Sequence, residues 1–179
     1  MALITTDRLI LRPPMAEDFD AYADYVSDPE CMAMIGGAQS RPVAWRSFMT
    51  YVGAWAATRV SMFWVFEQTQ GGEQGRFLGR IGPWAPEGWP GTEIGWGLRT
   101  DAQGHGYAME AAEASMHFAF EELGWTEAIH TIDPANTASQ AVATKLGSTN
   151  LGPCLLPDPI NRTVDKWGQN REQWMGRWG

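Results

Sequence analysis

A predicted strand, a glycine-rich turn and a predicted helix follow one another in mid-chain, and this unit restricts the possible folds most. The strand covers 92–98, the turn covers 103–108 with the sequence QGHGYA, and the alanine-rich helix covers 109–123. The first N–H groups of a helix have no partner within it, and the helix dipole favours negative charge there. Glycines let the backbone approach a ligand closely. The unit therefore predicts a nucleotide or phosphorylated-cofactor site at 103–108.

Hydrophobic patterning predicts the elements on either side of this unit. Apolar and β-branched runs predict strands at 8–12, 62–66, 77–82 and 128–132. Helical spacing and end signals predict helices at 15–27, 42–57 and 138–146. A loop is expected at 83–91, and two strands joined by an irregular loop are expected within 148–179. The resulting order, β-α-α-β-β-β-α-β-α-β-β, predicts one layered α/β or α+β domain over 1–179, with a mixed sheet.

Charge and cysteine content exclude several classes of function. The net charge is −8 and no Lys/Arg cluster is present, so a nucleic-acid partner is not expected. The two cysteines form no disulfide framework or zinc spacing, and no metal site is expected. The N-terminal residues do not resemble a signal peptide, and no apolar run approaches transmembrane length. We therefore expect a cytoplasmic protein with no membrane partner.

Three phosphate-binding patterns can be compared with the turn. A P-loop requires a Gly-Lys dipeptide, and the chain has none. A dinucleotide fingerprint requires a third glycine where this chain has Met109, and it belongs near the first strand of a βαβ unit. The third pattern, Gln/Arg-x-x-Gly-x-Gly/Ala, is satisfied at every constrained position from Gln103 to Ala108. It resembles the coenzyme A pyrophosphate loop of the GNAT acetyltransferases.

Motifs across residues 5–150 extend this resemblance to the branch related to ribosomal-protein N-acetyltransferases. They are TDRLILR at 6–12, SDPE at 27–30, FLGRIG at 77–82, EIGW at 93–96, MEA at 109–111, NTAS at 136–139 and KLG at 145–147. The resemblance implies a three-layer fold with a mostly antiparallel central sheet. Two parallel strands would splay apart in that sheet and hold the cofactor between them.

The resemblance also implies where acetyl-CoA binds. Backbone at 96–100 would hold the pantetheine arm, and the N–H groups at 103–108 would hold the pyrophosphate. The implied cofactor-binding residues are Trp96, Leu98, Gln103, Gly104, His105, Gly106, Tyr107, Ala108 and Asn136. For Asn136, helix capping is a second role that does not exclude the first. The His105 side chain is expected to point to solvent.

Similar enzymes carry a glutamate on the strand that holds Glu93, which makes Glu93 the candidate base for deprotonating the acceptor amine. A solvent-facing strand glutamate is the alternative. Ser139 matches a serine placed near the cofactor sulfur, where it would stabilise the departing thiolate. Its alternative role is to satisfy backbone groups at a helix N-terminus.

The function implied by the resemblance is acetyl transfer from acetyl-CoA to a primary amine, on a protein N-terminus or a small molecule. Acceptor specificity is expected in 28–41, 83–91 and 150–165. The oligomeric state is expected to be a monomer or a homodimer. The alternative is a non-catalytic acyl-CoA-binding sensor or interaction module, which the presence of Glu93 and Ser139 disfavours.

Overall fold

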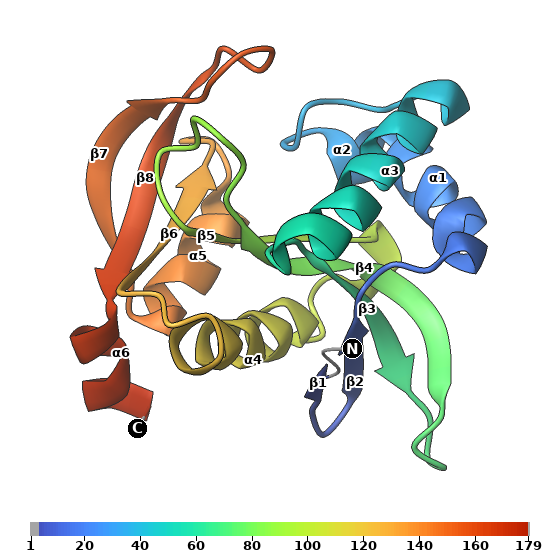
Figure 1. Cartoon of the computed structure of the whole chain (residues 1–179), viewed down its shortest axis with the longest axis horizontal. Coiled ribbons are helices and arrows are strands. Elements are labelled where there is room, and N and C mark those ends of the chain that lie inside the picture. Colours follow the sequence, from blue (N-terminus) through green and yellow to red (C-terminus); the bar gives the residue numbers. More distant parts are fainter. Residues whose placement is uncertain (1–3, 179) are drawn as a thin grey trace.

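The computed structural model describes residues 4–178, which form one eight-stranded sheet flanked by helices (Figure 1). The spatial order of the strands is β1-β2-β3-β4-β5-β6-β8-β7. Their bounds are β1 Ile4–Thr5, β2 Leu9–Arg12, β3 Phe63–Gln68, β4 Gln74–Trp84, β5 Glu93–Leu98, β6 Glu127–Ile132, β7 Thr149–Leu155 and β8 Thr163–Asn170.

All neighbouring strands are antiparallel except β5 and β6, which are parallel. Those two strands share only one pair of Cα partners, Glu93 with Ile129. The remainder of β5 therefore runs on without a ladder to β6. This is the mostly antiparallel mixed sheet that was predicted, and the two parallel strands diverge after Glu93.

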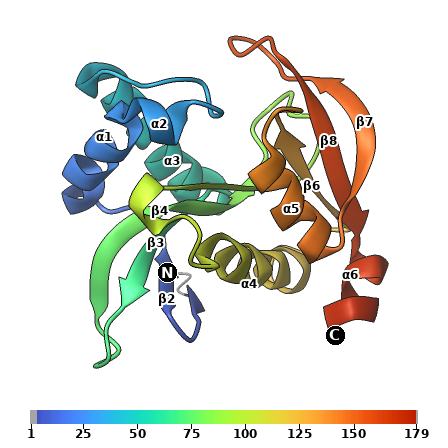
Figure 2. The same ribbon diagram turned by 180° about the vertical axis from the view of Figure 1, so that it is seen from behind.

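Helices cover both faces of the sheet (Figures 1 and 2). One face carries α1 Phe19–Ser27, α2 Pro29–Met32 and α3 Arg41–Thr58, and the opposite face carries α4 Tyr107–Glu121. The helix α5, Thr137–Leu146, lies beside β6, and α6, Arg171–Trp178, follows β8. Short 3₁₀ turns occupy Ala16–Asp18 and Thr100–Ala102.

The apolar run in β3 is buried on both faces because successive side chains point to opposite sides. Phe63 and Val65 belong to the core under α4. Trp64 and Phe66 belong to a second core, which is aromatic-rich and lies under α1 and α3. The sheet thus separates two hydrophobic cores, as expected for a strand whose first four residues are all apolar.

The C-terminal segment 148–178 differs in part from the prediction. Two strands were expected in 148–179, and β7 and β8 are present, but 171–178 forms a helix. Trp174 is fully buried, with its ring 6.1 Å from that of Phe120 in α4. This long-range packing has no signal in the local sequence. The short elements β1 and α2 were also absent from the predicted order.

Among the described residues, no helix is both long and apolar enough to cross a bilayer. The same residues contain no group of three or more His, Cys, Asp or Glu side chains arranged to hold a metal ion.

Candidate active site

The glycine turn adopts a backbone conformation that requires glycine. Gly104 and Gly106 have φ angles of 78° and 82°, in the left-handed region where a side chain is strained. Gly106 is the N-cap of α4, and no side chain caps that helix end. The first N–H groups of α4 are therefore left for an external acceptor.

One side chain just before β2 and another at the start of the turn hold the turn in place. Arg8 donates from Nε to Glu110 Oε2 at 2.7 Å and from Nη1 to the His105 carbonyl at 2.9 Å. Gln103 Nε2 donates to the Leu98 carbonyl at 3.2 Å. The Gln103 side chain thus ties the start of the glycine turn to the end of β5, across the 100–102 turn. His105 is exposed, as predicted.

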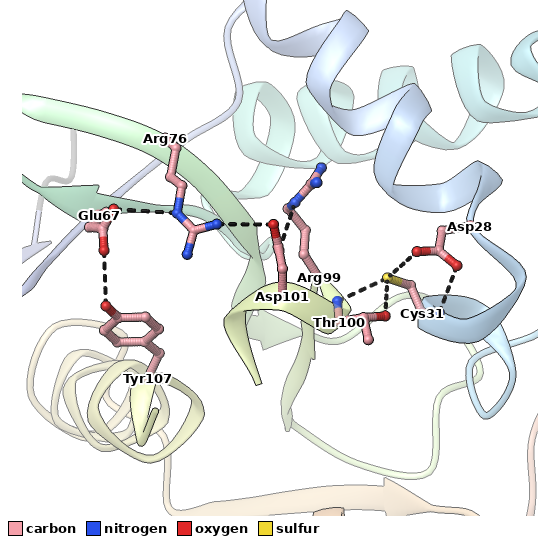
Figure 3. Close-up of polar contacts among 8 residues, drawn as sticks. All are labelled: Asp28, Cys31, Glu67, Arg76, Arg99, Thr100, Asp101 and Tyr107. Atoms are coloured by element: carbon pink, nitrogen blue, oxygen red, sulfur yellow. Dashed lines mark hydrogen bonds and ion pairs between the residues drawn. The ribbon is translucent and has the colours of Figure 1, made fainter. Parts of the chain in front are cut away.

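Figure 3 shows a second set of contacts, between the first residue of α4 and the 100–102 turn. The Tyr107 hydroxyl donates to Glu67 Oε1 at 3.0 Å. Arg76 lies between two carboxylates, 3.3 Å from Glu67 and 3.0 Å from Asp101. Arg99 also pairs with Asp101, at 3.2 Å. This chain of contacts links the first residue of α4 and the 100–102 turn to β3 and β4.

The same view shows Cys31 joining α2 to the 100–102 turn. Its sulfur lies 3.2 Å from Asp28 Oδ2 and 3.1 Å from the Thr100 hydroxyl, and it accepts the Thr100 N–H at 3.2 Å. Burial raises the pKa of the Cys31 thiol. A protonated thiol is a poor nucleophile, so Cys31 acts here as a contact between two segments.

Glu93 is a buried carboxyl group at the start of β5, with only 5% of its surface exposed. Thr131 donates to it from its backbone N–H at 3.1 Å and from its hydroxyl at 3.0 Å, and the Trp89 indole N–H donates to Oε2. Burial raises its pKa to about 7, because it outweighs these hydrogen bonds and the positive charge of Arg80. The solvent-facing alternative for Glu93 is therefore wrong.

Trp96, Ser139 and Asn136 form a connected group beside the divergence of β5 and β6. The Trp96 indole donates to the Ser139 hydroxyl oxygen at 3.1 Å, and Asn136 Oδ1 accepts the Ser139 backbone N–H at 3.0 Å. Asn136 is thus the N-cap of α5. The Ser139 hydroxyl oxygen is occupied by the hydrogen bond from Trp96. The hydroxyl proton has no acceptor in the described part of the chain.

His130 lies close to this group but has a structural role. Its Nδ1 is 2.7 Å from the Ile94 carbonyl and its Nε2 is 2.9 Å from the Ser148 hydroxyl. Burial lowers its pKa to about 4. The ring is neutral near pH 7 and packs against Trp96, with 4.7 Å between ring centroids.

The stretch of sequence that forms this site also matches a family model. Residues 8–149 match the model for the acetyltransferase (GNAT) domain. The chain belongs to the GNAT acetyltransferase family. It is a GNAT N-acetyltransferase, and the family uses an acyl-CoA donor.

A curated relative of this GNAT enzyme is the FsC-acetyl coenzyme A-N(2)-transacetylase of Aspergillus fumigatus. The two are 31% identical over 191 residues, covering 95% of this chain and 77% of the relative. A crystal structure of an acetyltransferase from Agrobacterium tumefaciens strain C58 is 29% identical, with a TM-score of 0.81. That likeness covers 96% of this chain and 95% of the other.

Structural neighbours of this GNAT chain also include RimL, described as a ribosomal L7/L12 alpha-N-protein acetyltransferase, and RimJ. RimJ of Mycobacterium smegmatis, described in complex with CoA-disulfide, is 20% identical with a TM-score of 0.69. The likeness covers 92% of this chain and 83% of RimJ. At this identity the likeness concerns the fold.

The predicted site residues of this GNAT enzyme lie on the two faces of β5. Glu93 shares a face with Gly95 and Gly97, on the side of α1–α3, since Met62 and Tyr25 pack over those glycines. Trp96 and Leu98 lie on the opposite face, with α4. The segment from Gln103 to Ala108 leads into α4, and Asn136 and Ser139 lie at the N-terminus of α5. The candidate base and the candidate thiolate-stabilising serine thus approach the diverging strands from opposite sides.

Sequence patterns missed the residues that shape the surroundings of Glu93 and the residue that holds the glycine turn from outside it. Trp89 was placed only in a loop of expected acceptor specificity, and Thr131 only in a strand. Arg8 and Arg80 fell within family motifs that suggest no individual role. Thr131, Arg8 and Arg80 act through contacts far away in the sequence, so local spacing carries no signal for them. Trp89 is only four residues from Glu93, but a loop residue has no periodicity that would predict this contact.

Proposed function

We propose that this enzyme transfers an acetyl group from acetyl-CoA to a primary amine, with Glu93 as the base that accepts the amine proton. The observation that carries the proposal is the buried Glu93 carboxyl group, whose pKa is raised to about 7. It lies where β5 and β6 share their single pair of residues. A carboxylate titrating near neutral pH is matched to proton abstraction.

An amine attacks a thioester only after losing its proton. Deprotonation at pH 7 costs about 4–5 kcal/mol for a lysine-like amine and about 1 kcal/mol for an α-amine. A positioned general base contributes roughly 10²–10⁴ in rate. In the proposed reaction the amine nitrogen forms a bond to the acetyl carbon, the carbon–sulfur bond breaks, and the amine proton passes to Glu93 directly or through water.

The donor side of the proposal rests on the two helix N-termini. The N–H groups of the glycine turn and the first turn of α4 would bind the pyrophosphate. The Ser139 hydroxyl, with Trp96 satisfying its oxygen, would donate its proton in a hydrogen bond to the departing thiolate. The side-chain contacts of Gln103 and Asn136 use Nε2 and Oδ1, which leaves Gln103 Oε1 and Asn136 Nδ2 for the cofactor.

Calorimetry with acetyl-CoA, followed by thiol release against a panel of amines, tests the donor and the acceptor. We expect binding and turnover with primary amines. Binding without turnover on any amine would favour the sensor alternative. No binding of acetyl-CoA would exclude both the enzyme and the sensor. In the same assay Ser139→Ala should lower kcat and leave acetyl-CoA affinity nearly unchanged.

The pH dependence tests the role of Glu93. Wild-type kcat/KM should rise with pH through about 7, as Glu93 ionises. Glu93→Gln should lose this step and roughly 10²–10⁴ in rate near neutral pH. The deficit should shrink as the pH approaches the pKa of the amine, because free amine then forms without help. Identical profiles for the two proteins would show that Glu93 is not the base.

A further inference from the structure

Arg80 is a buried cation without an acidic partner in the described part of the chain. It lies on β4 opposite Gly97 of β5, and 9% of its surface is exposed. Its Nη1 donates to the Met62 sulfur at 2.8 Å, and its Cζ lies 5.0 Å from the centroid of the Tyr51 ring. Its Nε has no hydrogen-bond partner. A buried charge is strongly unfavourable unless it is paired.

The polar atoms left unsatisfied around Arg80 can all donate a hydrogen bond, and two of the three can only donate. The buried Tyr25 hydroxyl has no partner and sits over Gly97, the residue opposite Arg80. Trp64, the residue opposite Arg80 on β3, has an unpartnered indole N–H in the same aromatic core. Arginine and tryptophan side chains can only donate. A ligand group with acceptor oxygens and a negative charge would therefore satisfy the donors around Arg80.

Arg80 and Glu93 stand on either side of Met62. Gly97, which faces Arg80, lies about 13 Å along β5 from Glu93, with Gly95 between them. The Met62 methyl group packs over Gly95, and Glu93 Oε1 lies 3.5 Å from the position that a Cβ at Gly95 would take. The Glu93 carboxylate, the Met62 side chain and the Arg80 guanidinium therefore lie in a row over the backbone of the β5 glycines. Methionine is flexible and adapts readily to new packing.

We propose that the acceptor is a small molecule carrying both an amine and a carboxylate, with its amine at Glu93 and its carboxylate at Arg80 while Met62 moves aside. This inference rests on the proposed role of Glu93 as base. The chemistry is unchanged, because the amine nitrogen is acetylated and the carboxylate serves only for recognition. A small acceptor fits best, since Glu93 and Arg80 are both more than nine-tenths buried.

Matched acceptor pairs test the proposal on the full chain with saturating acetyl-CoA. Each pair is an ω-amino carboxylate and the unsubstituted amine of the same carbon number, over a range of chain lengths. We expect the best amino carboxylate to exceed its neutral partner in kcat/KM by roughly 10- to 100-fold, the usual size of a hydrogen bond to a charged group. Carboxylates without the amine should compete with the amino carboxylate.

Arg80→Met should bring the ratio within each pair towards one and remove competition by the carboxylate. Methionine replaces the buried charge with an apolar side chain, a change that folds tolerate well. Thermal unfolding checks the fold, and Arg80→Lys, which keeps the charge but loses the planar fork, should retain part of the ratio. Arg46→Met is the matched control, because it removes the same charge from an exposed site on α3 and should keep the full ratio.

Neutral amines used as well as amino carboxylates would overturn the proposal and leave the proposed function standing. Preference for peptide N-termini over every amino carboxylate would overturn it in favour of a protein acceptor. Acetyl-CoA binding without turnover on any amine would reject the proposed function itself. The wild-type comparison and the competition experiment decide the matter even if the Arg80 variants fail to fold.

Discussion

At the scale of single residues, the chemistry depends on how Glu93 is buried. Three donor groups, from Thr131 and Trp89, hold its two oxygens. Each hydrogen bond lowers the pKa, yet burial outweighs them and raises it to about 7. The carboxyl group is thus fixed in orientation and able to exchange a proton at neutral pH.

The raised pKa of Glu93 makes the stability of the fold depend on pH. The carboxyl titrates near 4.5 when unfolded and near 7 when folded, so the folded chain binds more protons between these values. Stability should therefore fall as the pH rises from about 4.5 and level off above about 7. The total loss is about 3 kcal/mol, from the shift between the two pKa values.

Denaturant unfolding of the wild type and Glu93→Gln at pH 5 and pH 8 measures this effect. The variant carries no titrating group at this position, so its stability relative to the wild type should increase towards pH 8. Equal losses of stability in both proteins would contradict the raised pKa.

At the scale of elements, the strand, turn and helix around residue 103 act as one unit. The predicted reason for the glycines was close approach to a ligand. The structure adds a conformational reason, because Gly104 and Gly106 both have positive φ. A Cβ at Gly106 would also lie 3.4 Å from Arg8 Nη2, on the side chain that holds the turn.

Gly106→Ala should weaken acetyl-CoA binding and destabilise the fold by about 1–2 kcal/mol, the usual penalty of a left-handed conformation for a residue with a Cβ. Calorimetry and thermal unfolding measure the two effects. Gly53→Ala is the control, since Gly53 is exposed within α3 and a Cβ there meets no atom within 4 Å. It should stabilise the fold by up to about 1 kcal/mol and leave binding unchanged. Wild-type affinity in Gly106→Ala would contradict the role of the turn.

At the scale of the whole molecule, the sheet holds two cores apart, and a buried ion pair ties β2 to the start of α1. Arg12 donates to both oxygens of Asp18, at 2.7 Å each, and the two side chains are 9% and 6% exposed. The Met15 backbone N–H also donates to Asp18 at 2.7 Å. The pair thereby fixes the start of α1, one of the helices that cover the sheet face carrying Glu93.

Asp18→Asn should destabilise the fold by about 3–5 kcal/mol, because it leaves the Arg12 charge buried without a counter-charge. Asp20→Asn is the matched control, since Asp20 pairs with Arg41 on the surface, where the two side chains are 80% and 59% exposed. Its effect should stay below about 1 kcal/mol. Unfolding in denaturant measures both variants, and equal losses would show that the buried pair does not carry this stability.

Features that depend on residues close together in the sequence were predictable, and features that depend on long-range packing were not. Helices such as α3 and strands such as β3 were predictable, because side-chain periodicity records which face is buried. The helix α6 was not, because its formation depends on Trp174 packing against α4. The burial of Glu93 was likewise left open by a strand pattern that fits an exposed or a buried glutamate.

The sequence by itself determined the order of most elements, the glycine turn at 103–108 and the family to which the chain belongs, because these depend on residues close together along the chain. Only the tertiary structure decided the partners of Glu93, the link from Trp96 to Ser139 and the uncompensated charge of Arg80. Apart from the contact of Trp89 with Glu93, those features arise where strands and loops distant in sequence meet. There, burial changes proton affinity and leaves donors without acceptors, and no local pattern records either effect.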